Sequence, residues 1–195
     1  MWTRALEVLF PAQCGACSAI GSGFCERCAS EARSFQEMRD DVRVRALGVY
    51  EGALRRAVLA LKDGRRDVAQ ALGTRLARIA DAHAALVPVP TTAVRRRVRG
   101  IDGVVEVARV AAQSGGCMLH VLRQGAGDAQ RGRSRAQRLL ARGRFICSQR
   151  LDGERLVLVD DVCTTGATLH DCASTLRAAG ADVREAVVVA MAPNE

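Results

Sequence analysis

Two adjacent carboxylates near the end of the chain occupy a position that suggests ligand chemistry. Residues 156–159 have the composition of a buried strand in a parallel sheet, and Asp160 and Asp161 follow directly. Open α/β sheets bind their ligands at the carboxyl ends of such strands. Burying two unpaired charges is costly, so these acids are poor core residues. They are suited to accept hydrogen bonds from sugar hydroxyls, or to hold a divalent cation through those hydroxyls or through water.

The residues that follow add a group of hydroxyls at the start of a predicted helix. The segment reads Thr164, Thr165, Gly166, Ala167 and Thr168. Gly166 lets a ligand approach the backbone closely, and a helix N-terminus favours an anion. Diol recognition beside phosphate recognition predicts a pocket for a ribose 5-phosphate. The alternative is a structural strand, turn and helix in which threonine caps the helix, but capping leaves the two acids unexplained.

Four of the eight cysteines have the spacing of a metal site. They form two C-x2-C pairs with seven residues between them, namely Cys14, Cys17, Cys25 and Cys28. Four thiolates complete the tetrahedron that zinc prefers, and an all-sulfur set indicates a closed, structural site. Two disulfides are the alternative. They are disfavoured in a reducing cytoplasm, which is the location expected for a chain that shows no secretory signal.

Composition limits the function classes. The chain has 29 Lys and Arg against 21 Asp and Glu, and its net charge of +8 favours anionic partners such as phosphates or nucleic acid. Aromatic residues make up only 3%, which is few for a protein that stacks bases on exposed rings. A hydrophobic content of 49% excludes disorder as the dominant state. No apolar run has the length of a membrane helix, so no membrane insertion is expected.

Hydrophobic periodicity predicts the elements that must position these residues. Helical spacing is found over residues 54–61, 68–79, 101–112 and 169–176. Short apolar runs predict strands over residues 44–50, 84–90, 119–122, 156–159 and 183–190. The alternation favours an α/β fold with a mainly parallel sheet flanked by helices. We expect a zinc module over residues 1–36, a charged linker over 37–45, and the α/β domain over 44–195.

The motifs also resemble a known family. Residues 156–168 closely resemble the signature of type I phosphoribosyltransferases, which bind phosphoribosyl pyrophosphate (PRPP). The cysteine module, the helix Arg55-Arg-Ala-Val-Leu-Ala-Leu-Lys62, Val87-Pro-Val-Pro90, Arg99-Gly100 and the signature follow one another in that order. This order resembles the ComF/GntX family of competence-associated proteins over nearly the whole chain.

The resemblance implies roles for individual residues. Asp160 and Asp161 would be the catalytic pair that binds the ribose hydroxyls, and residues 164–168 would hold the 5-phosphate. The pyrophosphate loop would consist of Val87, Pro88, Val89, Pro90 and Thr91. A flexible loop carrying Arg99 and Gly100 would close over the pyrophosphate, which the neighbouring arginines 95–97 could also grip.

The implied reaction is Mg2+-dependent phosphoribosyl transfer to an unidentified nitrogen acceptor, with Mg2+ bridging pyrophosphate and ribose oxygens. The chain departs from the family at two positions. Ile101-Asp102-Gly103 stands where Phe-Asn-Gln is common, and Ala141 stands where an asparagine is usual. Both departures concern loop closure and the acceptor site, and they leave the ribose-phosphate residues intact.

A second interpretation is a non-enzymatic adaptor in competence, which would bind single-stranded DNA and DNA-uptake proteins and keep the pocket for ligand binding. The net charge of +8 favours it, as do the seven arginines between Arg123 and Arg144, which have a single acid among them. The residues alone leave both interpretations open.

Overall fold

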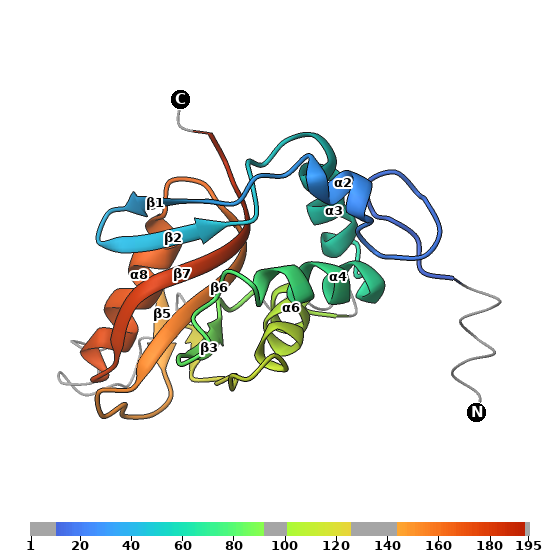
Figure 1. Cartoon of the computed structure of the whole chain (residues 1–195). Helices are drawn as coiled ribbons and strands as arrows, with labels where there is room; N and C mark the ends of the chain where they lie inside the picture. The colour runs from blue at the N-terminus through green and yellow to red at the C-terminus, as the bar shows by residue number, and fades with distance from the viewer. Residues whose placement is uncertain (1–10, 92–100, 126–143, 194–195) are drawn as a thin grey trace, which may run out of the picture.

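A computed structural model describes residues 11–91, 101–125 and 144–193 of the chain. Its centre is a sheet with the strand order β1-β2-β7-β6-β3 (Figure 1). Strands β2, β7, β6 and β3 are parallel, and β1 pairs antiparallel with β2 at one edge. The strands are β1 (Phe35–Arg39), β2 (Val42–Ala46), β3 (Ala85–Pro88), β6 (Arg155–Cys163) and β7 (Asp182–Met191). The fold is thus mixed α/β with a mostly parallel sheet, as predicted.

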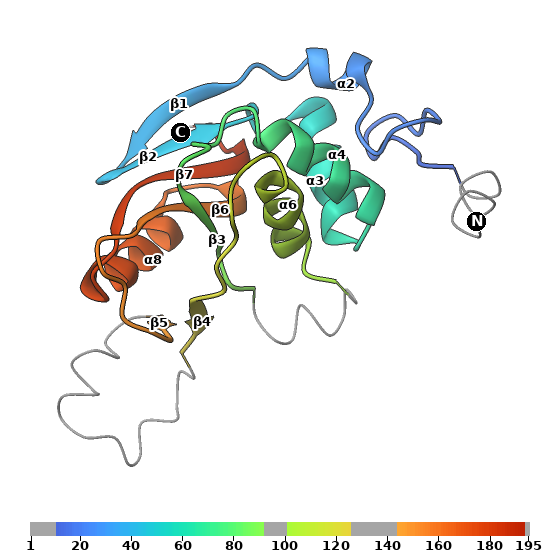
Figure 2. The same ribbon diagram turned by 60° about the horizontal axis from the view of Figure 1, so that its bottom comes forward.

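Helices cover both faces of this sheet (Figure 2). Helix α8 (Ala167–Ala178) packs on one face, and α3 (Gly52–Lys62), α4 (Arg66–Leu76) and α6 (Gly103–Ala112) pack on the other. Successive strand residues point to opposite faces. Leu156 and Leu158 therefore join the core beneath α8, while Val157 and Val159 join the core beneath the other three helices. The cores on both faces of the sheet are apolar, which explains why every residue from 156 to 159 is hydrophobic.

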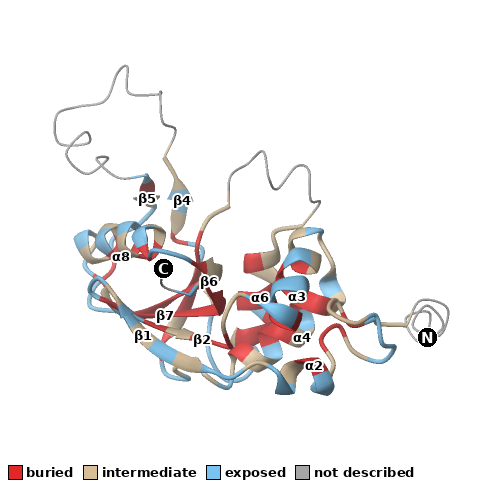
Figure 3. Ribbon diagram, turned by 90° about the horizontal axis from the view of Figure 1, so that it is seen from above, coloured by how far each residue is buried: buried red, intermediate tan, exposed pale blue. Residues whose placement is uncertain are grey.

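Smaller elements complete the described part of the chain. Helix α2 (Glu26–Ser30) lies in the cysteine-rich segment. Strands β4 (Leu122–Gln124) and β5 (Phe145–Cys147) form a separate two-stranded antiparallel sheet. In Figure 3 the buried residues are concentrated in the strands and on the helix faces that turn toward them. Within the described residues no helix is both long and apolar enough to cross a membrane.

The segment predicted to be a charged linker is instead a hairpin, so that expectation was wrong. Residues 37–45 lie in β1, the turn at Asp40, and β2. The predicted strand over 44–50 begins two residues earlier and ends at Ala46. Charge concealed the pattern, because Arg43 and Arg45 alternate with buried valines. Their guanidinium groups lie 3.0 and 3.1 Å from Glu185 of β7, which neutralises a buried acid.

The other predicted elements are largely confirmed, with shifted ends. Helices α3, α4, α6 and α8 occupy the four predicted helical regions. The strand expected over 119–122 starts only at Leu122, and β5 forms at the end of the arginine-rich stretch. Strand β6 is longer than expected, because it continues through Asp160 and Asp161 to Cys163. Residues 126–143 lie outside the described residues, and so do Arg99 and Gly100.

Gly180 and Gly153 offer a matched test of the packing that fixes β7 after α8. Both have left-handed backbones, with φ of +104° and +76°. A Cβ on Gly180 would lie 1.9 Å from the carbonyl oxygen of Leu151, whereas a Cβ on Gly153 would meet nothing within 4 Å. We expect Gly153→Ala to cost about 1 kcal/mol and Gly180→Ala roughly 3 kcal/mol of unfolding free energy. Urea denaturation measures both, and equal losses would contradict the predicted clash.

Candidate ligand pocket and metal centre

The candidate pocket lies where the parallel strands β3 and β6 end side by side. Val87 pairs with Leu158, and Pro88 pairs with Val159. The polar residues that follow these pairs therefore emerge at the same edge of the sheet. This edge carries Thr91 after β3, the two aspartates within β6, and the hydroxyl-rich turn that leads to α8. It is the edge at which open α/β sheets bind ligands.

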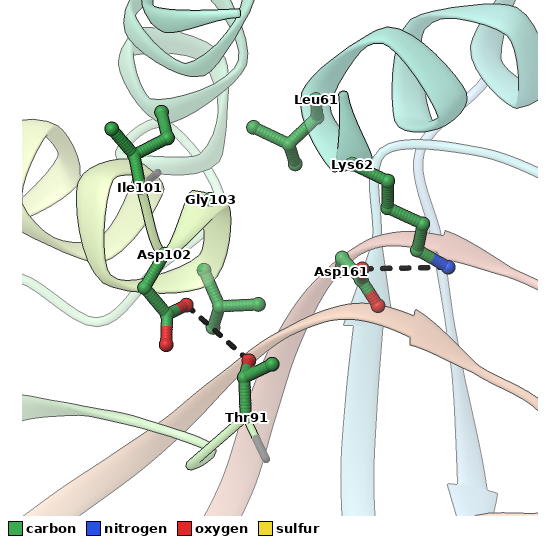
Figure 4. A pocket seen from close by; sticks show the side chains of 8 residues that line it. Leu61, Lys62, Thr91, Ile101, Asp102, Gly103 and Asp161 are labelled. Carbon is green, nitrogen blue, oxygen red and sulfur yellow. Dashed lines mark hydrogen bonds and ion pairs between the residues drawn. The ribbon is translucent and has the colours of Figure 1, made fainter. Parts of the chain in front are cut away.

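Asp161 lines a small pocket between β6, α3 and α6 (Figure 4). One of its carboxylate oxygens lies 3.4 Å from Nζ of Lys62, the last residue of α3. On the other side of the pocket, the hydroxyl of Thr91 donates to Oδ1 of Asp102 at 3.3 Å. The lining residues are Leu61, Lys62, Thr91, Ile101, Asp102, Gly103, Val104 and Asp161. Two carboxylates, one hydroxyl and one ammonium thus surround a single recess.

Asp160 points away from this pocket, because it is the preceding residue of the same strand. It pairs with Val188, whose side chain belongs to the core beneath α8. Its Oδ1 accepts the backbone N–H of Asp161 at 2.8 Å. Burial, together with the charge of Asp161, raises the pKa of Asp160 to about 8. The raised pKa favours the protonated form of Asp160 more than in an ordinary aspartate. The two acids, expected as a matched pair at a strand end, point in opposite directions.

The hydroxyl-rich turn stands at the N-terminus of α8, as predicted. Thr164 and Thr165 are exposed, and Oγ1 of Thr165 accepts the N–H of Ala167 at 3.4 Å. Gly166 has φ of +90°, and a Cβ there would lie 2.6 Å from Cβ of Arg39 in β1. Glycine is therefore required both by the turn and by the close approach of β1. Thr168 accepts a hydrogen bond from Arg144 at 3.4 Å.

The predicted pyrophosphate loop, residues 87–91, is only partly available to a ligand. The N–H of Val89 donates to the carbonyl of Val159 at 2.8 Å, and Pro88 and Pro90 have no N–H. The carbonyl of Pro90 accepts a hydrogen bond from Gln124 at 3.2 Å. Of these five residues, Thr91 is the one that lines the pocket. Arg99 and Gly100, assigned to the neighbouring flexible loop, lie outside the described residues.

Sequence reasoning did not assign two pocket residues, Lys62 and Asp102. A signal for Lys62 existed, since it is the only lysine in the chain and ends the helix that carries the family resemblance. Asp102 was noticed only as a departure from the family. In the structure its carboxylate accepts the N–H of Val105 at 3.4 Å and so caps α6, in addition to its bond with Thr91.

The four cysteines predicted as metal ligands come together in space. Their sulfur atoms all lie within 4.8 Å of one another, and Cys14 and Cys28 are buried. The backbone N–H groups of Ala16 and Cys25 both point at Sγ of Cys14, each at 3.5 Å. Hydrogen bonds to sulfur favour the thiolate, which is the form that binds metal. None of the four is in a disulfide. The donor set fits a structural zinc ion.

Charge at the cluster also favours a metal. The backbone N–H of Ala19, and then the side chain of Arg27, lower the pKa of Cys17 to about 6. Burial raises the pKa of Cys28 above the usual range of a thiol, and the hydrogen bonds with the neighbouring cysteines raise it further. A divalent cation would relieve the crowding of thiolates at this point.

The cysteine cluster packs against α3 and α4 rather than standing apart. A Cβ on Gly23 would lie 2.0 Å from the carbonyl oxygen of Asp67, and one on Gly15 would lie 2.9 Å from Ala60. Arg56 of α3 donates to the carbonyl of Ala16 at 2.8 Å. Cys14, Phe24 and Cys28 belong to the same core cluster as the buried faces of α3 and α4. The division into a module of residues 1–36 and a domain of 44–195 stays a prediction.

Comparison with known proteins gives little beyond this geometry. No protein-family model matches the chain, and no curated protein matches it. One solved structure with a similar chain is described as that of the allosteric regulatory enzyme of purine biosynthesis. The two chains share 23% identity with a TM-score of 0.44, over 62% of this chain and 26% of the other. This chain therefore matches about a quarter of that protein, and a likeness of this degree identifies no family.

Zinc binding leads to a direct prediction. Purified protein should contain about one zinc per chain, and Cys28→Ser should lower both the zinc content and the melting temperature, because the buried site anchors the cysteine segment on α3 and α4. Metal analysis and thermal melting measure the two effects. Cys117→Ser, at an exposed cysteine outside the cluster, is the control. Metal-free protein with unchanged melting behaviour would show that the cluster is not a zinc site.

The raised pKa of Asp160 predicts how stability depends on pH. Between about pH 4 and the folded pKa of about 8, the folded protein holds a proton that the unfolded chain has lost, so the unfolding free energy falls as pH rises through this window. Asp160→Asn removes this dependence. We expect the variant to melt several degrees above the unmodified protein at pH 9 and close to it at pH 4. Each kcal/mol of unfolding free energy shifts the melting temperature of a domain of this size by about 2–4 °C.

The exposed Asp171 of α8 is the control position for this experiment. Asp171→Asn should leave the pH dependence of melting unchanged. A wild-type melting temperature that does not fall between pH 5 and pH 9 would contradict the raised pKa of Asp160.

Proposed function

We propose that the protein binds PRPP at the carboxyl ends of β3 and β6 and transfers its phosphoribosyl group to a nitrogen acceptor. One observation carries the proposal: a pocket that presents the carboxylate of Asp161 lies at the same sheet edge as the hydroxyl-rich turn at the N-terminus of α8. A diol-binding acid and an anion-binding helix start are the two parts that a ribose phosphate needs. The resemblance of residues 156–168 to type I phosphoribosyltransferases supports the same ligand.

In this proposal each part of the edge binds one part of the ligand. Asp161 accepts hydrogen bonds from the ribose hydroxyls. Asp160 joins it after a local shift of β6, because in the ligand-free protein its side chain points to the other face of the strand. Thr164, Thr165, Gly166, Ala167 and Thr168 hold the 5-phosphate. Thr91, with Arg99 and Gly100 from the adjoining loop, faces the pyrophosphate.

Magnesium belongs to this proposal as a companion of the ligand. The carboxylates of Asp161 and Asp102 and the hydroxyl of Thr91 are the oxygen donors that Mg2+ prefers, so the pocket residues fit the ion. When bound with PRPP, Mg2+ would neutralise charge on the pyrophosphate leaving group.

The transfer itself requires little covalent chemistry from the protein. The bond between C1 of the ribose and pyrophosphate breaks with its electron pair going to pyrophosphate, and the acceptor nitrogen forms the new bond with its lone pair and then loses a proton to solvent. The positively charged sugar that develops is stabilised by nearby carboxylates. The residues of this chain therefore act by positioning and by charge, which is where such sites obtain most of their acceleration.

Membership of the ComF/GntX family, a role in competence and a cytoplasmic location remain predictions from the sequence. Single-stranded DNA binding is one too. The net charge of +8 favours it, but most of the stretch from Arg123 to Arg144 lies outside the described residues. Affinity for single-stranded DNA that falls steeply with salt would support the adaptor role.

Asp161→Asn tests the proposed function. Titration calorimetry with PRPP and Mg2+ should show binding to the unmodified protein and a loss of affinity of about 10- to 100-fold in the variant, because a charged hydrogen-bond acceptor is replaced by a neutral one. Asp152→Asn, at an acid 87% exposed in a turn, should bind like the unmodified protein. Pyrophosphate release against a panel of bases and amines then tests transfer. No heat with PRPP at any ionic strength would refute the proposal.

A further inference from the structure

Lys62 is the only cation among the described residues that line the pocket. In Figure 4 its side chain extends from the end of α3 toward Asp161, with Nζ 3.4 Å from a carboxylate oxygen. Every one of the other 28 basic residues of the chain is an arginine. The ammonium group of lysine is a compact charge on a flexible stem, and phosphates are among its usual ligands.

The backbone of Lys62 is held firmly beside the pocket. The preceding residue, Leu61, is buried in the core. A Cβ on Gly103, at the start of α6, would lie 2.9 Å from Cγ of Leu61 and 3.1 Å from its carbonyl oxygen. The ends of α3 and α6 are therefore in direct contact. The flexible part of Lys62 is its side chain, 30% exposed, which can move without a change in either helix.

The ion pair that Lys62 makes is loose. A strong pair between an ammonium and a carboxylate has a separation of about 2.7–2.9 Å, shorter than the 3.4 Å observed here. One carboxylate also leaves donors of the ammonium available. The second acid of the pocket, Asp102, accepts hydrogen bonds from Thr91 and from the N–H of Val105 through Oδ1. The ammonium can therefore change partners at little cost.

The pocket also needs a cation if it is to accept an anion. Asp161 and Asp102 both line it, and their charges oppose a phosphate or pyrophosphate group. Lys62 offsets one of these charges in the ligand-free protein. The pocket has room for about one water molecule, so an anion would lie over it, where the partly exposed ammonium of Lys62 can meet it.

We propose that Lys62 is the pyrophosphate-binding residue of this pocket and that it changes partner when the ligand binds. In the ligand-free protein it pairs with Asp161. When PRPP binds over the pocket, the ammonium moves to the pyrophosphate oxygens, and Asp161 becomes free to accept hydrogen bonds from the ribose. This inference rests on the proposed function, and it adds a residue that couples the two halves of the ligand.

Selective chemistry on the unmodified protein tests the change of partner. Lys62 carries the only side-chain amine, and acetylation of it is read on the tryptic peptide spanning residues 57–65. The acetylation rate should fall at least about fivefold with PRPP and Mg2+, and also with pyrophosphate and Mg2+, because a bound ammonium is shielded from the reagent. Ribose should give no protection. An unchanged rate under conditions where calorimetry shows PRPP bound would overturn the proposal.

Substitutions separate binding from a merely structural role. Lys62→Met should weaken both PRPP and pyrophosphate by about tenfold or more, and Lys62→Arg should retain most of the affinity. Arg55→Met removes the same charge from an exposed position on the same helix and should leave both affinities nearly unchanged. Affinity of Lys62→Met for pyrophosphate equal to that of the unmodified protein would refute the role of Lys62.

Failure of this inference can be told from failure of the proposed function. If PRPP binds and Asp161→Asn weakens it, while Lys62 is neither protected nor required, the function stands and the role of Lys62 falls. If PRPP does not bind the unmodified protein at all, both fall. Protection by pyrophosphate is measured on folded, unmodified protein, so the test holds even if Lys62→Met does not fold.

Discussion

The structure depends on a conflict within β6 between burial and charge. Helices cover both faces of this central strand, so residues 156–159 must be apolar, yet the same strand continues through two aspartates. A partly buried carboxylate without a cation is costly, and each aspartate meets that cost differently. Asp161 pairs with Lys62, whereas Asp160 has a raised pKa, which favours its neutral form. The end of β6 therefore carries two acids whose charges are handled in different ways, and the proposed ligand site lies at this end.

Helix α3 connects this edge to the cysteine cluster. Its outer surface receives Gly15 at Ala60, its Arg56 holds the carbonyl of Ala16, and its last residue is Lys62. A metal held by the four thiolates would therefore also fix the platform from which Lys62 reaches Asp161. None of the four cysteines lines the pocket, so the cluster contributes to the position of α3 and not to the chemistry of the proposed ligand.

The β1–β2 hairpin supports the other half of the candidate site. Arg39 packs against Gly166 so closely that a Cβ would lie 2.6 Å away. At the hairpin turn, Asp41 binds His170 at 2.9 Å and also pairs with Arg177, which ties the hairpin to α8. These ion pairs and hydrogen bonds lower the pKa of Asp41, with the bond from His170 as the largest cause. The hydroxyl-rich turn is thus held between its own helix and a strand that comes from far away in the chain.

Local signals in the sequence determined the α/β class, the four helical regions, the cysteine cluster, and the succession of apolar strand, acids and hydroxyl turn. Periodicity and spacing act over a few residues, so the sequence carries them directly. Tertiary structure decided what depends on distant partners. Residues 37–45 looked like a charged linker because Glu185, which neutralises the arginines of this hairpin, lies about 140 residues further on. The opposite directions of Asp160 and Asp161 required knowing that β6 does not end before them. Lys62 and Asp102 joined the pocket only because α3 and α6 meet at Leu61 and Gly103, and no local pattern records a contact between two helices.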